Sequence, residues 1–186
     1  MYSGFAIGGK ARAGKNVLAE RLGQIMVDQG YWPTCLAFST PLKEMVAQEI
    51  GHTKKHAGAR DEMIRIGDRE RGRDPDVFVK LMSHEVDRVC LFGGSPIITD
   101  VRRANEFDWC VNAGFFTVFV DAPVEDRVAR LREMGEPVGI ASSPHPTESE
   151  AYTFPWHTRV FNRHSVNPSA VADENARIIL AAAGWL

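Results

Sequence analysis

The sequence has few cysteines and no long apolar segment. Cys35, Cys90 and Cys110 are too few and too widely spaced for a disulfide framework or a zinc site. The first residues do not show the basic region, apolar run and cleavage site of a secretory signal, and no apolar run is as long as a membrane span. We therefore expect a reduced, cytoplasmic protein that has no membrane partner.

The chain also lacks an excess of charge of either sign. Its 22 Lys and Arg and 24 Asp and Glu residues give a formal net charge of -2, which offers no basic field for binding nucleic acid. The six histidines show no metal-ligand spacing. A length of 186 residues, 44% of them hydrophobic and 25% charged, is typical of a globular protein, and we expect one domain over 1–186.

Strand and helix patterns alternate along the chain, which predicts an α/β fold with a parallel sheet and crossover helices. Short apolar runs predict strands at 3–7, 34–38, 97–99, 115–121 and 158–162. Amphipathic spacing and helix-end signals predict helices at 15–30, 41–50, 76–91, from 124 onward and at 168–183. In the helix from 124, we expect Val124, Val128 and Leu131 to form the apolar face. The polar segments 52–75 and 133–156 are expected to be irregular; the alternative is a solvated helix in the first and a broken helix in the second.

Residues 5–22, FAIGGKARAGKNVLAERL, have glycines and a lysine at the spacing of a phosphate-binding loop. Small residues let backbone N–H groups approach phosphate oxygens, and a helix N-terminus favours an anion. The alternative is a glycine-rich turn with a solvated lysine. The expected nucleotide contacts are Gly9, Ala11, Ala13, Gly14, Lys15, Asn16 and Val17.

Asn16 stands where such loops normally have a Ser or Thr that helps to hold Mg²⁺. An amide side chain also has an oxygen acceptor, so Asn16 could ligate the ion directly or through water.

Five segments resemble, in order, the deoxynucleoside monophosphate kinases of bacteriophages. They are GGKARAGKN (8–16), LAFSTPLKEM (36–45), IITDVRRANEFD (97–108), HPTESE (145–150) and FNRHS (161–165). Asn16 departs from the acidic residue usual in that family, and Ser39 and Thr40 stand where it often has alanine and aspartate. These departures concern the metal and acceptor contacts.

The resemblance implies a P-loop kinase fold, a three-layer α/β/α structure with a five-stranded parallel sheet, plus an acceptor-binding segment (52–75) and a lid region (127–156). It implies phosphate transfer from ATP, with Mg²⁺, to a deoxynucleoside monophosphate. The partners would be these small molecules, and the location the host cytoplasm if the gene is carried by a phage. The oligomeric state, a homodimer included, stays open.

The resemblance also implies roles for individual residues. The catalytic set would be Lys15, Asp100, Arg102 and Arg130, and the metal would lie at Asn16 and Asp100. Arg127 and Arg130 would close over the donor phosphates. The acceptor would contact Phe38, Leu42, Arg60, Gly67, Arg73, Asp100, Arg102 and Glu106.

Each role has a simpler alternative. Asp100 could cap the helix that follows it, Arg127 and Arg130 could be ordinary solvated side chains, and Phe38 and Leu42 could be core. At the level of the whole chain, the alternatives are a P-loop kinase for another small acceptor, such as phosphomevalonate or dephospho-coenzyme A, and a nucleotide-binding module without turnover.

Overall fold

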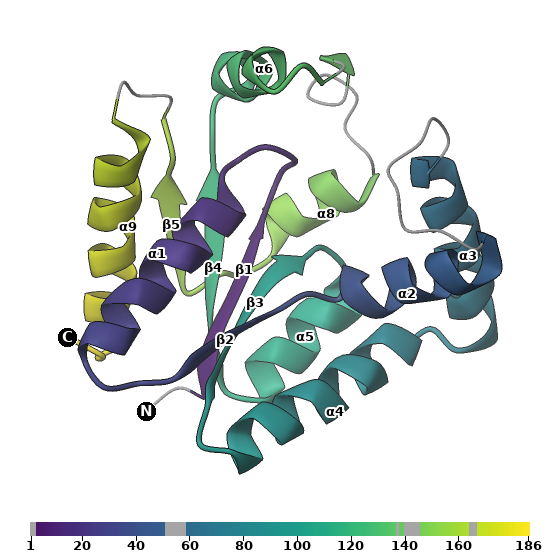
Figure 1. Cartoon of the computed structure of the whole chain (residues 1–186), viewed down its shortest axis with the longest axis horizontal. Coiled ribbons are helices and arrows are strands. Elements are labelled where there is room, and N and C mark those ends of the chain that lie inside the picture. The colour runs from purple at the N-terminus through teal and green to yellow at the C-terminus, as the bar shows by residue number, and fades with distance from the viewer. Residues whose placement is uncertain (1–2, 51–58, 137, 140–145, 164–166) are drawn as a thin grey trace.

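Five parallel strands form one sheet in the computed structural model, which describes residues 3–50, 59–136, 138–139, 146–163 and 167–186 (Figure 1). The strand order is β2-β3-β1-β4-β5. The strands are β1 (Gly4–Gly9), β2 (Pro33–Leu36), β3 (Ser95–Val101), β4 (Phe115–Asp121) and β5 (Thr158–Phe161). The expected parallel α/β sheet is therefore confirmed.

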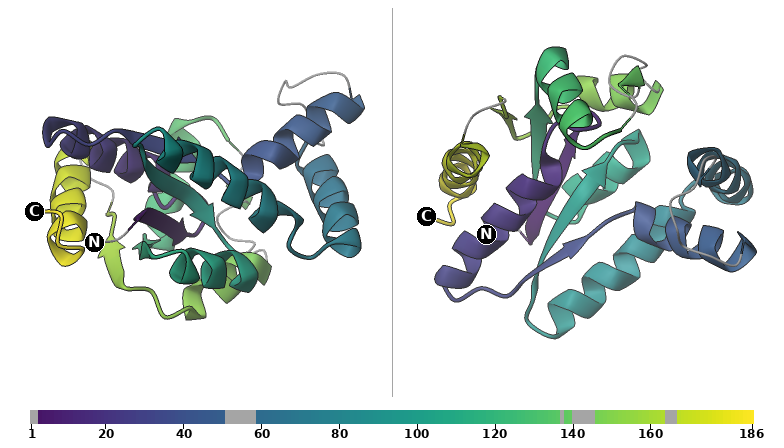
Figure 2. Two further views of the ribbon diagram at one scale, coloured as in Figure 1. Left: turned by 90° about the horizontal axis from the view of Figure 1, so that it is seen from below. Right: turned by 45° about the horizontal axis from the view of Figure 1, so that its top comes forward.

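Helices cover both faces of the sheet and give it three layers (Figures 1 and 2). On one face, α1 (Lys15–Asp28) packs beside α9 (Pro168–Ala182). The other face is covered by α2 (Ser39–Ile50), α4 (Val77–Leu91), α5 (Ala104–Asn112) and α8 (Pro146–Thr153). Figure 2 shows α3 (Ala59–Arg73) beside α2, at a distance from the strands, and α6 (Val124–Glu133) lies beyond the end of β4.

The central strand β1 has two different faces, because successive side chains in a strand point in opposite directions. Phe5 and Ile7 enter the core formed with α1 and α9, whereas Ala6 belongs to the core on the opposite face. Gly8 follows Ala6 on that second face, and the ring of Trp156 lies against it. The small residues of β1 thus leave room for an indole ring beside the strand.

Three elements differ from the main expectation. Segment 52–75 contains a regular helix, α3, over Ala59–Arg73, which was the alternative for that segment. Segment 133–156 includes the helix α8, in line with the alternative of a broken helix, and residues 137 and 140–145 lie outside the described part. Strand β3 extends to Val101, so Asp100 lies within the strand rather than beyond it.

The orientation of α6 also differs from the expectation. Its buried residues are Arg127 and Leu131, and Val124 is exposed. The apolar stripe was expected to face the core, but the helix instead turns an arginine toward the loop after β1. None of the described helices combines the length and apolarity that a membrane crossing needs.

Candidate functional site

The loop after β1 and the end of β3 lie next to each other at the carboxyl edge of the sheet. The chain leaves β1 toward β2 on one side and leaves β3 toward β4 on the other. Open α/β sheets bind ligands at such a point, where neighbouring connections run in opposite directions. The predicted phosphate loop and the end of β3 with Asp100 thus lie at the position where the topology of the sheet favours ligand binding.

The backbone of the loop has three residues with positive φ. Gly9 has φ 142°, Arg12 63° and Gly14 93°. A side chain at Gly9 would place its Cβ 2.3 Å from the carbonyl oxygen of Val120, so a glycine is required there. Gly14 is the N-cap residue of α1 and provides no side-chain cap. The first N–H groups of α1 therefore resemble the anion-binding end of a helix.

Every carbonyl oxygen from Gly9 to Ala13 accepts a hydrogen bond from a side chain. Lys15 Nζ donates to the oxygens of Gly9 (2.8 Å) and Lys10 (2.9 Å). The oxygens of the next three residues accept from Arg127 Nη1 (3.4 Å), Arg130 Nη1 (2.9 Å) and Asn162 Nδ2 (2.8 Å), in that order. The loop is therefore held by its carbonyl groups.

Asn162 follows β5 directly and connects the loop to α6. Besides donating to Ala13, it accepts a hydrogen bond from Arg130 Nη2 at its own carbonyl oxygen (2.7 Å). Its side chain also fills the space beside Gly14, where an added Cβ would be 1.9 Å from Nδ2. Asn162 belongs to the segment FNRHS, which is one of the five segments of the family resemblance. The spacing of residues in the sequence did not indicate that Asn162 contacts the loop.

The residues expected to contact the nucleotide differ in exposure. Lys15 is buried at the start of α1, whereas Asn16 and Val17 are exposed in the first turn. Ala11 is half-buried and Ala13 is buried. Arg127 and Arg130 of α6 both donate to carbonyl groups of the loop.

Asp100 binds the start of α2 across the sheet. Its Oδ1 accepts from the N–H of Phe38 (2.7 Å) and its Oδ2 from the N–H of Ser39 (3.0 Å). The alternative expected from the sequence was that Asp100 caps the helix that follows it, α5. The hydrogen bonds of the carboxylate go to the start of α2 and not to α5. Asp100 therefore caps α2, and this fixes the beginning of the α2–α3 pair relative to β3.

Glu106 is the buried acid of this edge, with 4% of its surface exposed. Its Oε2 accepts from the N–H groups of Arg102 (2.9 Å) and Arg103 (3.2 Å) and so caps α5. The pKa of Glu106 is raised to about 7, chiefly by burial and also by the negative charge of Asp100. The two N–H groups and the charge of Arg71 oppose this rise.

Arg71 is the arginine of α3 whose charge acts on Glu106. Burial lowers the pKa of its guanidinium, as does the charge of Arg103. The guanidinium carbon lies 4.6 Å from the centre of the Phe78 ring. Gly67 leaves room for it, because a Cβ there would be 2.9 Å from Arg71 Nη1. Arg103 extends toward α3, with Nη2 3.9 Å from Asp68 Oδ1.

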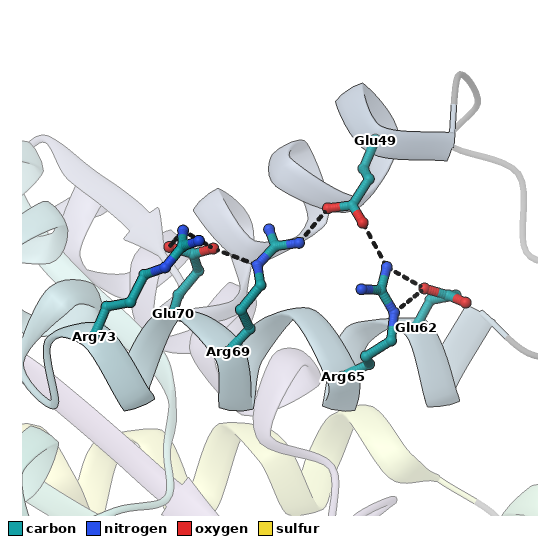
Figure 3. Close-up of polar contacts among 6 residues, drawn as sticks. All are labelled: Glu49, Glu62, Arg65, Arg69, Glu70 and Arg73. Carbon is teal, nitrogen blue, oxygen red and sulfur yellow. Dashed lines mark hydrogen bonds and ion pairs between the residues drawn. The ribbon is translucent and has the colours of Figure 1, made fainter.

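Three further arginines of α3, namely Arg65, Arg69 and Arg73, pair with acidic side chains, as Figure 3 shows. Glu49 of α2 accepts from Arg65 (2.6 Å) and Arg69 (2.8 Å), and these contacts lower its pKa. Arg73 is 70% exposed and pairs with Glu70 at 3.3 Å. Arg60 lies in the first turn of α3, and its side chain is outside the described residues. The sequence alone did not distinguish Arg71 from its neighbours.

The two apolar residues predicted to border the acceptor are buried. Phe38 and Leu42 are 4% and 7% exposed and belong to the core beneath α2. Arg102 is exposed at the end of β3. At the end of β3, exposed polar side chains therefore lie next to the buried apolar residues beneath α2.

Asn16 and Asp100 could supply a small number of oxygens to a cation. In the part of the chain that the structure describes, no group of three or more His, Cys, Asp or Glu residues could hold a metal ion. Mg²⁺ usually keeps several waters and binds through one or two carboxylates plus substrate phosphates, so a sparse donor set of this kind fits it.

The chain has no match among protein-family models and no significant match among curated protein sequences. Solved structures do resemble it. The APS kinase CysC of Mycobacterium tuberculosis, in complex with AMPPNP and APS, is 14% identical over 98% of both chains, with a TM-score of 0.56. A shikimate kinase from Bacteroides thetaiotaomicron is 14% identical over 95% of this chain and 97% of that one (TM-score 0.57). A gluconokinase from Sinorhizobium meliloti is 14% identical over 96% and 91% (TM-score 0.56). The chain therefore has the fold of the P-loop kinases.

Proposed function

We propose that this protein transfers a phosphoryl group from ATP to the phosphate of a deoxynucleoside monophosphate. The observation that carries the proposal is the turn from Gly9 to Lys15, whose carbonyl oxygens are all bound by side chains. A trans peptide bond points its N–H away from its C=O, so the turn offers N–H groups on the opposite side. A polyphosphate is the ligand that such a turn fits best.

The donor phosphates would lie against these N–H groups and the ammonium group of Lys15. Lys15 now donates to two loop carbonyls, and a terminal phosphate would draw it toward the ligand. Mg²⁺ would be held by Asn16 and Asp100 beside the phosphates, where it supplies positive charge to the transferring group. The protein's part in the reaction is then mainly to position the reactants and to stabilise charge.

The acceptor phosphate would lie at the end of β3, between Arg102 and the inward-facing side of α3. Arg71 places a guanidinium group near the buried Glu106, and Arg103 extends its guanidinium toward Asp68 of α3. Guanidinium groups bind phosphate through paired hydrogen bonds, and a monophosphate carries more charge than a hydroxyl acceptor. This cluster favours an acceptor that is itself a phosphate. The deoxynucleoside part of the proposal depends on the resemblance of the five sequence segments.

A second candidate is phosphoryl transfer to another small acceptor. The similar structures are named as kinases of APS, shikimate and gluconate, which favours this class. The arginine cluster argues against an uncharged acceptor, but it does not distinguish a nucleotide from another phosphate ester.

The test is ADP formation with a panel of acceptors at fixed ATP and Mg²⁺. The panel contains the common ribo- and deoxynucleoside monophosphates, phosphomevalonate, dephospho-coenzyme A, shikimate and gluconate. The proposal predicts turnover with one or more deoxynucleoside monophosphates. Turnover only with a non-nucleotide acceptor would favour the second candidate, and ATP binding without turnover on any acceptor would contradict both.

A further inference from the structure

We propose that Arg127, Arg130 and Asn162 are positioning residues of the phosphate loop, which act by holding three consecutive carbonyl oxygens. This inference rests on the proposed donor site and assigns these side chains to the loop rather than to the phosphates.

The first step of the argument is the pattern of contacts. Three side chains from two separate segments, α6 and the end of β5, reach the oxygens of Ala11, Arg12 and Ala13. In a regular helix or strand the carbonyl oxygens accept from backbone N–H groups, whereas here each of three consecutive oxygens accepts from a different side chain. The shape of this irregular turn therefore depends on side chains from α6 and from the end of β5.

The second step concerns the N–H groups. The described peptide bonds are all trans, so holding the oxygens of Ala11 and Ala13 turns the N–H groups of Arg12 and Gly14 the opposite way. The N–H of Ala13 closes the turn by donating to the oxygen of Lys10 at 3.2 Å. The side chains on the carbonyls thus set the direction of the N–H groups that a phosphate would meet.

The third step concerns the availability of the two arginines. Arg130 uses both terminal nitrogens, on the oxygens of Arg12 and Asn162, and burial lowers its pKa. Arg127 is 3% exposed. The hydrogen bonds to the carbonyls therefore fix where both guanidinium groups lie, and any N–H group left over on them acts from that fixed position.

The fourth step is the coupling of the loop to the end of α6. The guanidinium of Arg12, at the tip of the turn, forms an ion pair with Glu136, which follows α6. Arg12 also has a left-handed backbone conformation, which a non-glycine residue adopts at some cost. The turn, α6 and the residue after β5 therefore form one connected unit.

The experiment compares the ligand-free loop with donor binding in the same variants. Asn162→Asp keeps the size of the side chain and removes the donor to Ala13, Arg130→Ala removes the donor to Arg12, and Arg130→Lys restores one donor. Arg132→Ala is the matched control, because Arg132 is an exposed arginine of the same helix. Amide resonances of Gly14 and Lys15 are recorded by NMR without nucleotide, and ADP affinity is measured by calorimetry.

Asn162→Asp and Arg130→Ala are expected to shift both amide resonances before any nucleotide is added. They are also expected to raise the ADP dissociation constant about tenfold or more, with the acceptor KM changed less than about twofold. Arg130→Lys should recover part of the loss, and the double variant should lose less than the product of the two single effects. The control should change neither measurement.

Two results would overturn the inference. Weaker ADP binding with unshifted amide resonances would mean that the side chains contact the ligand themselves. Shifted resonances with unchanged ADP binding would mean that the conformation of the turn does not govern affinity. A wild-type protein that binds no ADP would instead overturn the proposed donor site, and the NMR comparison of the ligand-free variants does not depend on that result.

Discussion

The indole ring of Trp156 occupies the space that a side chain at Gly8 would need. A Cβ built on Gly8 would be 2.2 Å from Cη2 of the ring and 3.0 Å from the carbonyl oxygen of Val101. The indole is fixed in turn, because its Nε1 donates to the oxygen of Ala151 at 2.8 Å. The strand that leads to the phosphate loop is therefore packed directly against a residue of the segment between α8 and β5.

Gly8→Ala is expected to destabilise the protein, because the added methyl group overlaps a buried ring that is held by its hydrogen bond to Ala151. Overpacking of this kind costs about 1–3 kcal/mol. Gly23→Ala is the matched control: it lies within α1, its nearest contact would be an ordinary 3.5 Å, and alanine is favoured in helices by about 1 kcal/mol. Urea unfolding of the two variants should give shifts of opposite direction. Equal effects would contradict the close contact.

Lys15→Met is expected to abolish turnover and leave the fold intact. The ammonium group is the charge nearest to the proposed donor phosphates, and a methionine of similar length fills the same space without it. We expect turnover to fall by a factor of about 100 or more, with an unchanged circular dichroism spectrum. Lys80→Met, on the exposed side of α4, is the control. Near-normal turnover in Lys15→Met would remove the loop from the mechanism.

Arg71→Ala is expected to weaken acceptor binding more than Arg73→Ala. Arg71 faces the cluster around Glu106, whereas Arg73 is exposed and pairs with Glu70. Loss of a charged hydrogen-bond donor to phosphate should raise the acceptor KM about tenfold or more, with a smaller change in the KM for ATP. The two variants remove the same charge from the same helix, so only position distinguishes them. Equal KM values would exclude Arg71 from the acceptor site.

Glu106 is expected to make stability depend on pH. Its ordinary pKa of 4.5 is raised to about 7 in the folded protein, so between these values the folded state binds the proton more tightly than the unfolded state. The buried carboxylate therefore costs stability above pH 7, and this cost disappears as the pH falls toward 4.5.

Glu106→Gln removes this titration. The free energy of unfolding of the wild type, relative to the variant, should fall by about 1–3 kcal/mol between pH 5 and pH 8. Urea unfolding at intervals across that range measures the difference. Glu125→Gln, on an exposed position of α6, should show no such trend. A difference that stays constant with pH would show that Glu106 does not titrate in this range.

The elements with a strong local signal could be predicted from the sequence. The strand at 115–121 matches β4 to the residue, and the helix from Lys15 begins where the glycines end. Helix α3 was only an alternative at the sequence level, because its buried side includes Ile66 among charged residues and most of its surface is polar. Arg65 and Arg69 of this helix pair with Glu49 of α2, and a contact between two helices cannot be read from a local sequence pattern.

The site was predictable in outline but not in its detailed contacts. Spacing alone placed Gly9, Gly14 and Lys15 on one turn, since that turn is local in the chain. The contacts of Asp100 with the start of α2 and of Asn162 with Ala13 join residues far apart in the sequence. The resemblance placed Arg127 near the donor site, but hydrophobic periodicity did not indicate that its side chain is buried, because its partner, the carbonyl oxygen of Ala11, is far away in the sequence.

A loop whose conformation depends on side chains far away in the sequence cannot be moved to another protein by itself. Transplanting residues 8–16 alone onto the sheet of an unrelated enzyme would carry over the glycines and the lysine but none of the supports supplied by positions 127, 130 and 162. Engineers who wish to borrow this turn would have to graft those three anchors with it.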